Sequence, residues 1–435
     1  GPPGTGKTTT LVESIREVLK KESQVLVCAP SNAAVDLLTE KLSEQGVSTV
    51  RIGHPARVDE DILSQTLESK IAQHPDFKLL KDIKRKAEEY FKLGGKWKRN
   101  FGQSEREQRK ILIQEARNLK KDADRIHSGI VEDILFSTRV ITTTLIGANH
   151  SKLNGIHFTT CFIDEAGQAL EPASWIPIIK SNKVVFAGDH LQLPPTVKSF
   201  KAGNAGLKET LFEKAIKVQK ADVLLKEQYR MHEKIMTFPS NQFYEGILKA
   251  NDKNAQKKIF INDSVIEYID TAGTGFYESQ HPETKSSYNQ EEAKLLFKHL
   301  KNYLEKIYSE GYDLPLSIGV ISPYKAQVEL LKKLLGTSGI ELNIQDRITI
   351  NTIDGFQGQE RDLIYISLVR SNESGEIGFL SDERRMNVAL TRAQRKLVVL
   401  GDSATITVKN KFYNEFIDYI HEIHAYKSAF ELMYD

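Results

Sequence analysis

The stretch GPPGTGKT at residues 1–8 decides the fold, because it is a complete G-x-x-x-x-G-K-T phosphate-binding loop. Its glycines allow a turn tight enough for consecutive backbone N–H groups to point at an anion, and the helix expected behind it adds its positive dipole end. Lys7 would reach the outer phosphates, and the Thr8 hydroxyl would bind Mg²⁺. The helix-forming run 9–20 follows directly, which disfavours a chance match in a glycine-rich turn.

A phosphate-binding loop connects a buried parallel strand to a helix, and no residue precedes Gly1 to form that strand. We therefore expect the 435 residues to be the C-terminal part of a longer protein. This length is sufficient for two large α/β domains and an insertion.

The composition predicts a globular protein without a strongly basic surface. Lysine and arginine total 60 and aspartate and glutamate 58, so any nucleic-acid surface must be a local patch. Cys28 and Cys161 each lie in an apolar run, which predicts two small buried side chains rather than a reactive or metal-binding pair. No apolar stretch approaches the length that spans a membrane. We expect a protein of the cytoplasm, or of another reducing intracellular compartment, that makes no membrane contact.

Three stretches in the first half of the chain predict strands: the apolar runs at residues 24–29 and 159–163, which are typical of buried parallel strands, and residues 139–144, which resume the strand pattern. Ligands bind where such strands end, at the carboxyl edge of the sheet. Ser31 and Asn32 follow the first strand. They could cap the next helix or bond to a backbone phosphate, and the sequence leaves both possibilities open.

The third strand ends in Asp164 and Glu165, which is the partner that a phosphate-binding loop needs. Asp164 would hold Mg²⁺ through water or through Thr8, and Glu165 would take the proton of the attacking water. An acidic helix N-cap is the disfavoured alternative. A further strand at residues 183–187 leads to Gln192, which two prolines hold on a rigid loop where its amide can sense a γ-phosphate.

Between residues 62 and 130 the spacing of apolar residues changes to that of two antiparallel helices with a turn near Gly94 and Gly95. Basic residues outnumber acidic ones in this insertion, and its tip at residues 96–101 is basic and aromatic. The tip could grip a single strand, or it could be a solvated turn with Trp97 folded back, and neither is favoured. The helical positions are Ile83, Ala87, Tyr90, Leu112, Ala116, Leu119, Ala123 and Ile126.

A second α/β unit begins near residue 221 with the apolar run 223–225. Strands and helices alternate through the rest of the chain, which is typical of a parallel sheet. The predicted strands are residues 265–269, 317–321, 348–351, 363–368 and 397–401, and the clearest helices are 290–309 and 382–392.

Three motifs in this second unit carry a resemblance. They are Gln-Tyr-Arg-Met-His at 228–232, Thr-Ile-Asp-Gly-Phe-Gln-Gly-Gln-Glu at 352–360 and Asn-Val-Ala-Leu-Thr-Arg-Ala at 387–393. With the motifs of the first unit, and in this order, the chain resembles the superfamily 1 helicases over nearly its whole length. The closest likeness is to superfamily 1B enzymes related to the nonsense-mediated-decay helicase and the immunoglobulin mu-binding helicase.

The resemblance implies an α/β fold of two RecA-like phosphate-loop domains with parallel sheets. The first would cover residues 1–220, with the helical hairpin at about 62–130 inserted in it, and the second residues 221–435. ATP would bind with Mg²⁺ in the cleft between the domains, and single-stranded nucleic acid would cross their tops.

Motif matches assign the site residues by resemblance, with Arg230 and Arg392 matching two arginine fingers, cations that stabilise the phosphoryl-transfer transition state. The implied catalytic residues are Lys7, Asp164, Glu165, Gln192, Arg230 and Arg392, and the implied Mg²⁺ ligands are Thr8 and Asp164. The nucleotide-binding residues are Gly4, Thr5, Gly6, Lys7, Thr8 and Thr9, with Tyr229 stacking on adenine and Glu360 approaching the ribose and phosphate. The nucleic-acid contacts are Ser31, Asn32, Thr143, Pro323, Tyr324 and Thr352.

The implied function is ATP-driven movement of a monomer along single-stranded DNA or RNA, 5′ to 3′. An ATP-regulated clamp that does not move would use the same site. A nucleotidase or small-molecule kinase would give Tyr324, Thr352 and Arg392 no role. The family's adenine-selecting glutamine motif and its small β-barrel lie upstream of the phosphate loop, so ATP preference and strand unwinding depend on residues outside this sequence.

Overall fold

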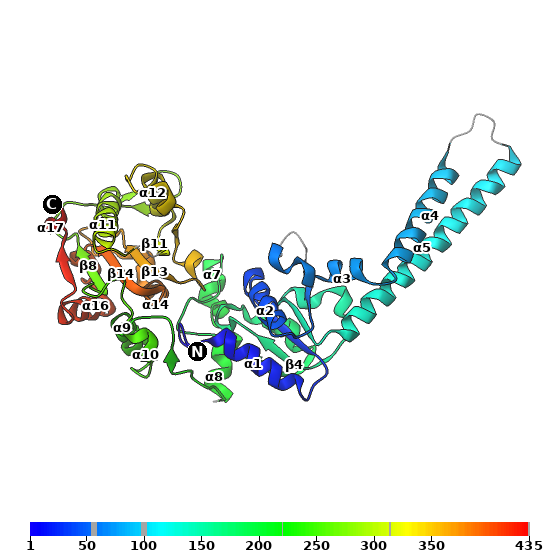
Figure 1. Ribbon diagram of the computed structural model, residues 1–435, viewed down its shortest axis with the longest axis horizontal. Helices are drawn as coiled ribbons and strands as arrows, with labels where there is room; N and C mark the ends of the chain where they lie inside the picture. Colours follow the sequence, from blue (N-terminus) through cyan, green and yellow to red (C-terminus); the bar gives the residue numbers. More distant parts are fainter. Residues whose placement is uncertain (54–58, 97–101, 220, 313–314, 434–435) are drawn as a thin grey trace. The chain divides into compact units, whose positions relative to one another are not determined.

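The computed structural model describes residues 1–53, 59–96, 102–219, 221–312 and 315–433. These form two compact units, each built on a parallel sheet with helices on both faces (Figure 1). The hairpin unit comprises Thr8–Gly188 and Pro195–Val218. The C-terminal unit comprises Gly1–Lys7, Asp189–Pro194 and Gln219–Asp435. The alternation of strands and helices expected from the sequence is confirmed in both.

The hairpin unit has a five-stranded parallel sheet in the order β2-β3-β1-β4-β5. The strands expected in this half of the chain are confirmed, because a sheet covered on both faces requires continuous apolar runs. Strand β2 was not expected, and its Arg51 is buried between Asp36 and Asn32. The strands are β1 (Val25–Ala29), β2 (Thr49–Ile52), β3 (Val140–Thr144), β4 (Phe158–Ile163) and β5 (Ser181–Phe186).

Successive residues of β1 face opposite sides of the sheet. Val25 and Val27 pack with α1 and α2 in one apolar cluster, whereas Leu26 and Cys28 pack in a second cluster on the other face. Both cysteines of the chain are buried and free. The helices of this unit include α1 (Lys7–Leu19), α2 (Asn32–Glu44), α3 (Leu67–Gln73), α6 (Glu171–Ile178) and α8 (Leu211–Gln219).

The predicted hairpin is confirmed and consists of α4 (Phe77–Gly95) and α5 (Gln103–Ser137), which lie side by side and project from the sheet of their unit (Figure 1). Ala87 of α4 and Ala116 and Ala123 of α5 are buried, so small side chains lie where the helices approach each other. Residues 97–101 of the expected basic, aromatic tip lie outside the described residues.

The C-terminal unit has a six-stranded parallel sheet in the order β12-β11-β13-β14-β8-β15. Helices α11 and α12 cover one face, and α9, α14 and α16 cover the other. The apolar run 223–225 forms no strand and is largely exposed. The strands are β8 (Ile266–Asp270), β11 (Ile318–Ser322), β12 (Ile348–Thr352), β13 (Arg361–Ser367), β14 (Ala393–Gly401) and β15 (Tyr426–Ser428). The helices are α9 (Glu233–Phe243), α11 (Gln290–Ser309), α12 (Lys325–Leu335), α14 (Glu383–Leu390) and α16 (Lys411–Glu422).

Candidate nucleotide and nucleic-acid sites

The phosphate-binding loop has the backbone that its glycines predict. Gly4 and Gly6 have φ angles of 74° and 73°, a left-handed conformation that glycine adopts without strain. The Thr5 hydroxyl donates to the Pro2 carbonyl at 2.8 Å, and Lys7 Nζ donates to the same oxygen at 3.2 Å. Because α1 begins at Lys7, its N-terminal dipole end lies directly behind the loop, an arrangement that fits a bound phosphate.

Asp164 lies immediately after β4 and is buried. Its Oδ1 accepts the Glu165 backbone N–H at 2.8 Å, and its own N–H donates to the Cys28 carbonyl at 2.9 Å. Thr8, the second predicted Mg²⁺ ligand, is half-buried in the first turn of α1, and Thr9 beside it is exposed. The hydroxyl and carboxylate oxygens of this pair are ligands that Mg²⁺ prefers, completed by phosphate and water.

Glu165 has a strained backbone, with φ 50° and ψ 38° in the left-handed region. Such a conformation is uncommon for a residue with a side chain, and it persists only where its surroundings impose it. The Gln168 side chain contributes one restraint, since its Nε2 donates to Glu165 Oε2 at 2.8 Å. A role for Gln168 was not predicted from the sequence. Its position three residues after Glu165, in a turn, was the available signal that its side chain could reach Glu165.

The loop that carries Gln192 is held by a polar network within the C-terminal unit. Gln192 Nε2 donates to Asp189 Oδ2 at 2.7 Å, and the Tyr244 hydroxyl donates to the same oxygen at 2.8 Å. Asn387 Nδ2 contacts the Tyr244 hydroxyl at 2.9 Å and the Leu191 carbonyl at 2.8 Å. Burial raises the pKa of Tyr244 well above its usual value, and the Asp189 charge adds to this, so the hydroxyl stays protonated and donates. No sequence signal pointed to Tyr244 or Asp189.

The Arg392 side chain is buried, with 2% of the residue exposed. Its Nε donates to the Val388 carbonyl at 2.8 Å and its Nη1 to the Gln359 carbonyl at 3.1 Å. Its Nη2 lies 3.5 Å from Gln192 Oε1. The structure thus brings together two predicted residues that are 200 positions apart in the chain.

Arg230, the other predicted finger, forms an ion pair with Glu360 through its Nε. Its Nη1 donates to the Thr391 carbonyl at 3.1 Å. The other carboxylate oxygen of Glu360 accepts from Gln394 Nε2 at 2.7 Å. Arg230, the predicted arginine finger, and Glu360, the predicted ribose contact, are therefore paired directly with each other.

Tyr229 is 55% exposed, so its ring is accessible for stacking. Its N–H donates to the Gly4 carbonyl at 2.8 Å, which ties this residue to the phosphate-binding loop. Its hydroxyl donates to Glu227 Oε2 at 3.0 Å, and this bond raises the pKa of the tyrosine.

The predicted nucleic-acid residues of the hairpin unit are engaged within the fold. Ser31 caps α2 by accepting the Ala34 N–H at 3.1 Å, and Asn32 Oδ1 accepts from Arg51 Nη2 at 2.9 Å. Thr143 is fully buried, and its hydroxyl donates to the Ile52 carbonyl at 3.0 Å. Of the two possibilities for Ser31, the structure shows the helix cap. Binding of nucleic acid by these side chains stays a prediction.

In the C-terminal unit, Pro323 and Thr352 are half-buried at the ends of neighbouring strands, where β11 and β12 are in register. Tyr324 belongs to the same edge, but it is only 4% exposed. Its hydroxyl bonds to the Ile377 carbonyl and to the Phe379 N–H, both at 3.3 Å.

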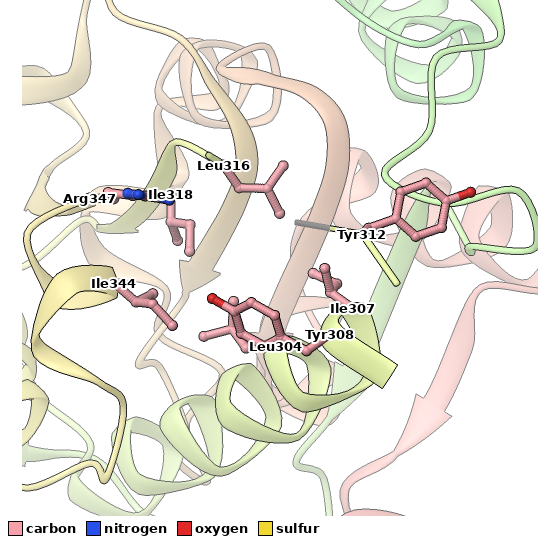
Figure 2. Close-up of a pocket in the computed structure, with 8 residues that line it drawn as sticks. All are labelled: Leu304, Ile307, Tyr308, Tyr312, Leu316, Ile318, Ile344 and Arg347. Atoms are coloured by element: carbon pink, nitrogen blue, oxygen red, sulfur yellow. The ribbon is translucent and has the colours of Figure 1, made fainter. Parts of the chain in front are cut away.

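A small apolar cavity lies elsewhere in this unit, at the amino end of β11 and the C-terminal end of α11 (Figure 2). It is lined by Leu304, Ile307, Tyr308, Tyr312, Leu316, Ile318, Ile344 and Arg347. None of the predicted site residues lines it. Within the described ranges, no three histidine, cysteine, aspartate or glutamate side chains cluster as metal ligands.

Comparison with known proteins gives two family matches, both to models described as an AAA domain, at residues 1–200 and 207–404. The chain is 36% identical over 440 residues to the DNA polymerase alpha-associated DNA helicase A of Schizosaccharomyces pombe, an alignment that covers 97% of this chain and 63% of the relative. It is 36% identical to the DNA-binding protein SMUBP-2 of Rattus norvegicus over 450 residues, all of this chain and 44% of the relative. A regulator of nonsense transcripts 1 homolog of Neurospora crassa is 34% identical over 422 residues, covering 92% of this chain and 35% of that protein.

Two parallel α/β sheets, a phosphate-binding loop and an Asp-Glu pair after a buried strand define a RecA-like phosphate-loop protein. Within that class, the chain belongs to the superfamily 1B helicases, in the group related to the nonsense-mediated-decay helicase and the immunoglobulin mu-binding helicase. It spans about half of the length of these curated relatives. In the described part of the chain, no helix combines the length and apolar character needed to cross a bilayer.

Proposed function

We propose that the protein hydrolyses ATP and uses the free energy to move along single-stranded DNA or RNA, with 5′ to 3′ polarity. The main support is the contact between Arg392 and Gln192, because it places a guanidinium beside the amide predicted to sense the γ-phosphate. Phosphoryl transfer through a loose transition state needs positive charge on the γ-oxygens, and an arginine supplies it. The names of the relatives, which include DNA helicases and a DNA-binding protein, support the same class of activity.

Each proposed catalytic residue has a distinct task. The glycine loop and Lys7 hold the triphosphate, and Thr8 and Asp164 hold Mg²⁺, which neutralises phosphate charge when bound. Glu165 accepts the proton of the attacking water, and its constrained backbone keeps the carboxylate in one orientation. Tyr229 stacks on the adenine.

Nucleic acid would bind at the carboxyl edges of both sheets, through Ser31, Asn32 and Thr143 in the hairpin unit and Pro323, Tyr324 and Thr352 in the C-terminal unit. We propose two domains that divide at residues 220 and 221, and a monomeric enzyme that acts in a reducing intracellular compartment. Backbone contacts of this kind do not distinguish one base from another.

The test is steady-state ATP hydrolysis with no nucleic acid, with single-stranded DNA and with the matching RNA at one fixed low salt concentration. The Glu165→Gln variant serves as the blank. We expect stimulation by at least one of the two strands. Hydrolysis that is indifferent to both would favour a nucleotidase, whereas stimulation without displacement of a protein block from the strand would favour the stationary clamp.

A further inference from the structure

Phe379 is an exposed aromatic residue at the edge of the sheet where the proposed nucleic-acid residues lie. It is 54% exposed, and its ring contacts the buried ring of Tyr324, with 5.5 Å between centroids and 39° between planes. Tyr324 directly follows Ser322 and Pro323 at the end of β11, and Ser322 is in register with Thr352. Phe379, rather than Tyr324, is thus the aromatic ring of this pair that solvent reaches.

Hydrogen bonds to the Tyr324 hydroxyl fix the backbone on both sides of Gly378, and this holds the Phe379 ring in its exposed position. The Phe379 N–H donates to the Tyr324 hydroxyl, which in turn donates to the Ile377 carbonyl, each at 3.3 Å. Gly378 between them has a φ of 54°, and a Cβ at this position would lie 2.6 Å from the Tyr324 hydroxyl oxygen. Only glycine permits this approach. Burial raises the pKa of Tyr324, which keeps the bridging hydroxyl protonated.

A cation accompanies the exposed ring. The Arg385 guanidinium carbon lies 5.0 Å from the centroid of Phe379, and Arg385 Nη1 donates to the Phe379 carbonyl at 3.3 Å. Lys325, next to Tyr324 in the sequence at the start of α12, has a mostly exposed side chain that lies 3.8 Å from the Glu329 carboxylate. An exposed aromatic ring with a basic group beside it matches a nucleotide, because the ring can stack on a base while the cation attracts a phosphate.

The surroundings of the ring favour nucleic acid over a protein partner. The neighbouring exposed residues Gly378 and Ser381 are small and Leu380 is buried, so Phe379 is the large apolar side chain that segment 378–381 exposes. Stable protein interfaces need a contiguous, closely packed core of apolar surface, whereas one ring is sufficient to stack on one base.

We propose that Phe379, supported by Tyr324 and flanked by Arg385, is a base-stacking position for single-stranded nucleic acid. This rests on the proposed function, since it places one base of the bound strand above the carboxyl edge of the C-terminal sheet. Stacking tolerates every base, so the contact adds affinity without sequence preference.

The experiment measures binding of a fluorescein-labelled oligo-dT and of an abasic oligonucleotide of equal length by fluorescence anisotropy. The protein is compared with its Phe379→Ala and Phe379→Trp variants. Tyr308→Ala is the matched control, because Tyr308 is 49% exposed in the same unit but lies at the opposite end of the sheet, beside the amino end of β11 (Figure 2). Thermal unfolding checks that each variant is folded.

We expect Phe379→Ala to weaken oligo-dT binding by roughly 5- to 150-fold and to leave abasic binding unchanged. Phe379→Trp should retain binding, and its added tryptophan emission should be quenched by oligo-dT. Unchanged oligo-dT binding by Phe379→Ala, or an equal loss on both oligonucleotides, would overturn the stacking role while leaving the proposed function intact. If the unaltered protein binds neither these DNA oligonucleotides nor a labelled oligo-U of equal length, the proposed function fails as well.

Discussion

At the carboxyl edge of the hairpin unit's sheet, β4 ends in two carboxylates, Asp164 and Glu165. At the same edge of the C-terminal unit's sheet, β11 ends in Pro323 and Tyr324, and the Arg370 guanidinium carbon lies 6.0 Å from the tyrosine ring centroid. Both sheets are parallel and covered on both faces, but the segments after these two strands carry different side chains. Topology therefore sets where a ligand meets each sheet, and these segments decide the chemistry that it meets.

Each edge also has one residue in a strained backbone conformation, Glu165 with φ 50° and Val369 with φ 74°. A β-branched residue rarely adopts positive φ, so the surrounding residues must impose this conformation on Val369. Its N–H donates to Glu292 Oε1 at 3.0 Å, and its carbonyl accepts from Asn289 Nδ2 at 3.4 Å. In the hairpin unit, the residue with the strained backbone is itself charged, Glu165. In the C-terminal unit, the strained residue is Val369, and the buried carboxyl group of Glu292 accepts its N–H.

The largest effect is expected from Arg392→Ala, which removes a cation of the C-terminal unit from the proposed reaction. We expect kcat for ATP hydrolysis to fall about 10³- to 10⁵-fold, with a much smaller loss of ATP affinity, because the charge acts mainly on the transition state. Steady-state kinetics and equilibrium nucleotide binding measure the two quantities. Arg395→Ala is the control, since that arginine pairs with Asp362 at 3.0 Å and should have little effect. An unchanged kcat in Arg392→Ala would show that the arginine is not a finger.

The next effect tests the carboxylate edge. Glu165→Gln should lower kcat about 10²- to 10⁴-fold while nucleotide still binds, because an amide cannot accept the proton of water. Single-turnover hydrolysis and binding of a fluorescent ATP analogue check this. Glu171→Gln, at the start of α6 where Glu171 pairs with Lys214, is the matched control and should turn over normally. Normal turnover by Glu165→Gln would refute the assignment of the base.

The smallest effect concerns the buried carboxyl group beneath Val369. Burial raises the pKa of Glu292 to about 7. As pH rises from about 4.5 to 7, the unfolded chain has lost this proton while the folded protein keeps it, so the group's contribution to stability falls by up to ~3 kcal/mol. Above pH 7 both states are ionised and the contribution is constant.

Glu292→Gln removes this titration. We expect the variant to be more stable than the parent at pH 8 by up to about 3 kcal/mol, with the difference vanishing near pH 4.5. Urea unfolding at pH 5, 6, 7 and 8 measures it, and Glu291→Gln, the exposed neighbour that pairs with Lys294, should show no such trend. A pH-independent difference between Glu292→Gln and the parent would contradict the raised pKa.

The strands could be predicted to within a few residues because sheets covered on both faces need continuous apolar runs, and the hairpin because its helical spacing is regular. Strand β2 could not, since it is short and contains Arg51. That arginine is tolerated in the interior because Asp36 and Asn32 satisfy it, and no local pattern reveals partners 15 and 19 residues away.

For the candidate site, motifs indicated which residues follow each strand but not how deeply they are buried. The resemblance implied that Tyr324 contacts the backbone of a nucleic-acid strand, but Tyr324 is only 4% exposed and its ring contacts that of Phe379. The supports of the motif residues, such as Tyr244 for the Gln192 loop, come from helices distant in sequence. Such contacts depend on tertiary packing between distant segments, and they leave no regular residue spacing that could be recognised in a single sequence.

The ion pair between Arg230 and Glu360 would make the proposed nucleotide binding an exchange of counter-ions. An incoming phosphate would have to displace the carboxylate from the guanidinium, so the net gain would be the difference between two attractions rather than one full attraction. The displaced carboxylate would be repelled by the phosphate and would become available to accept the ribose hydroxyls. Under this proposal a triphosphate would be bound and released repeatedly without the tight capture that an unpaired arginine would impose.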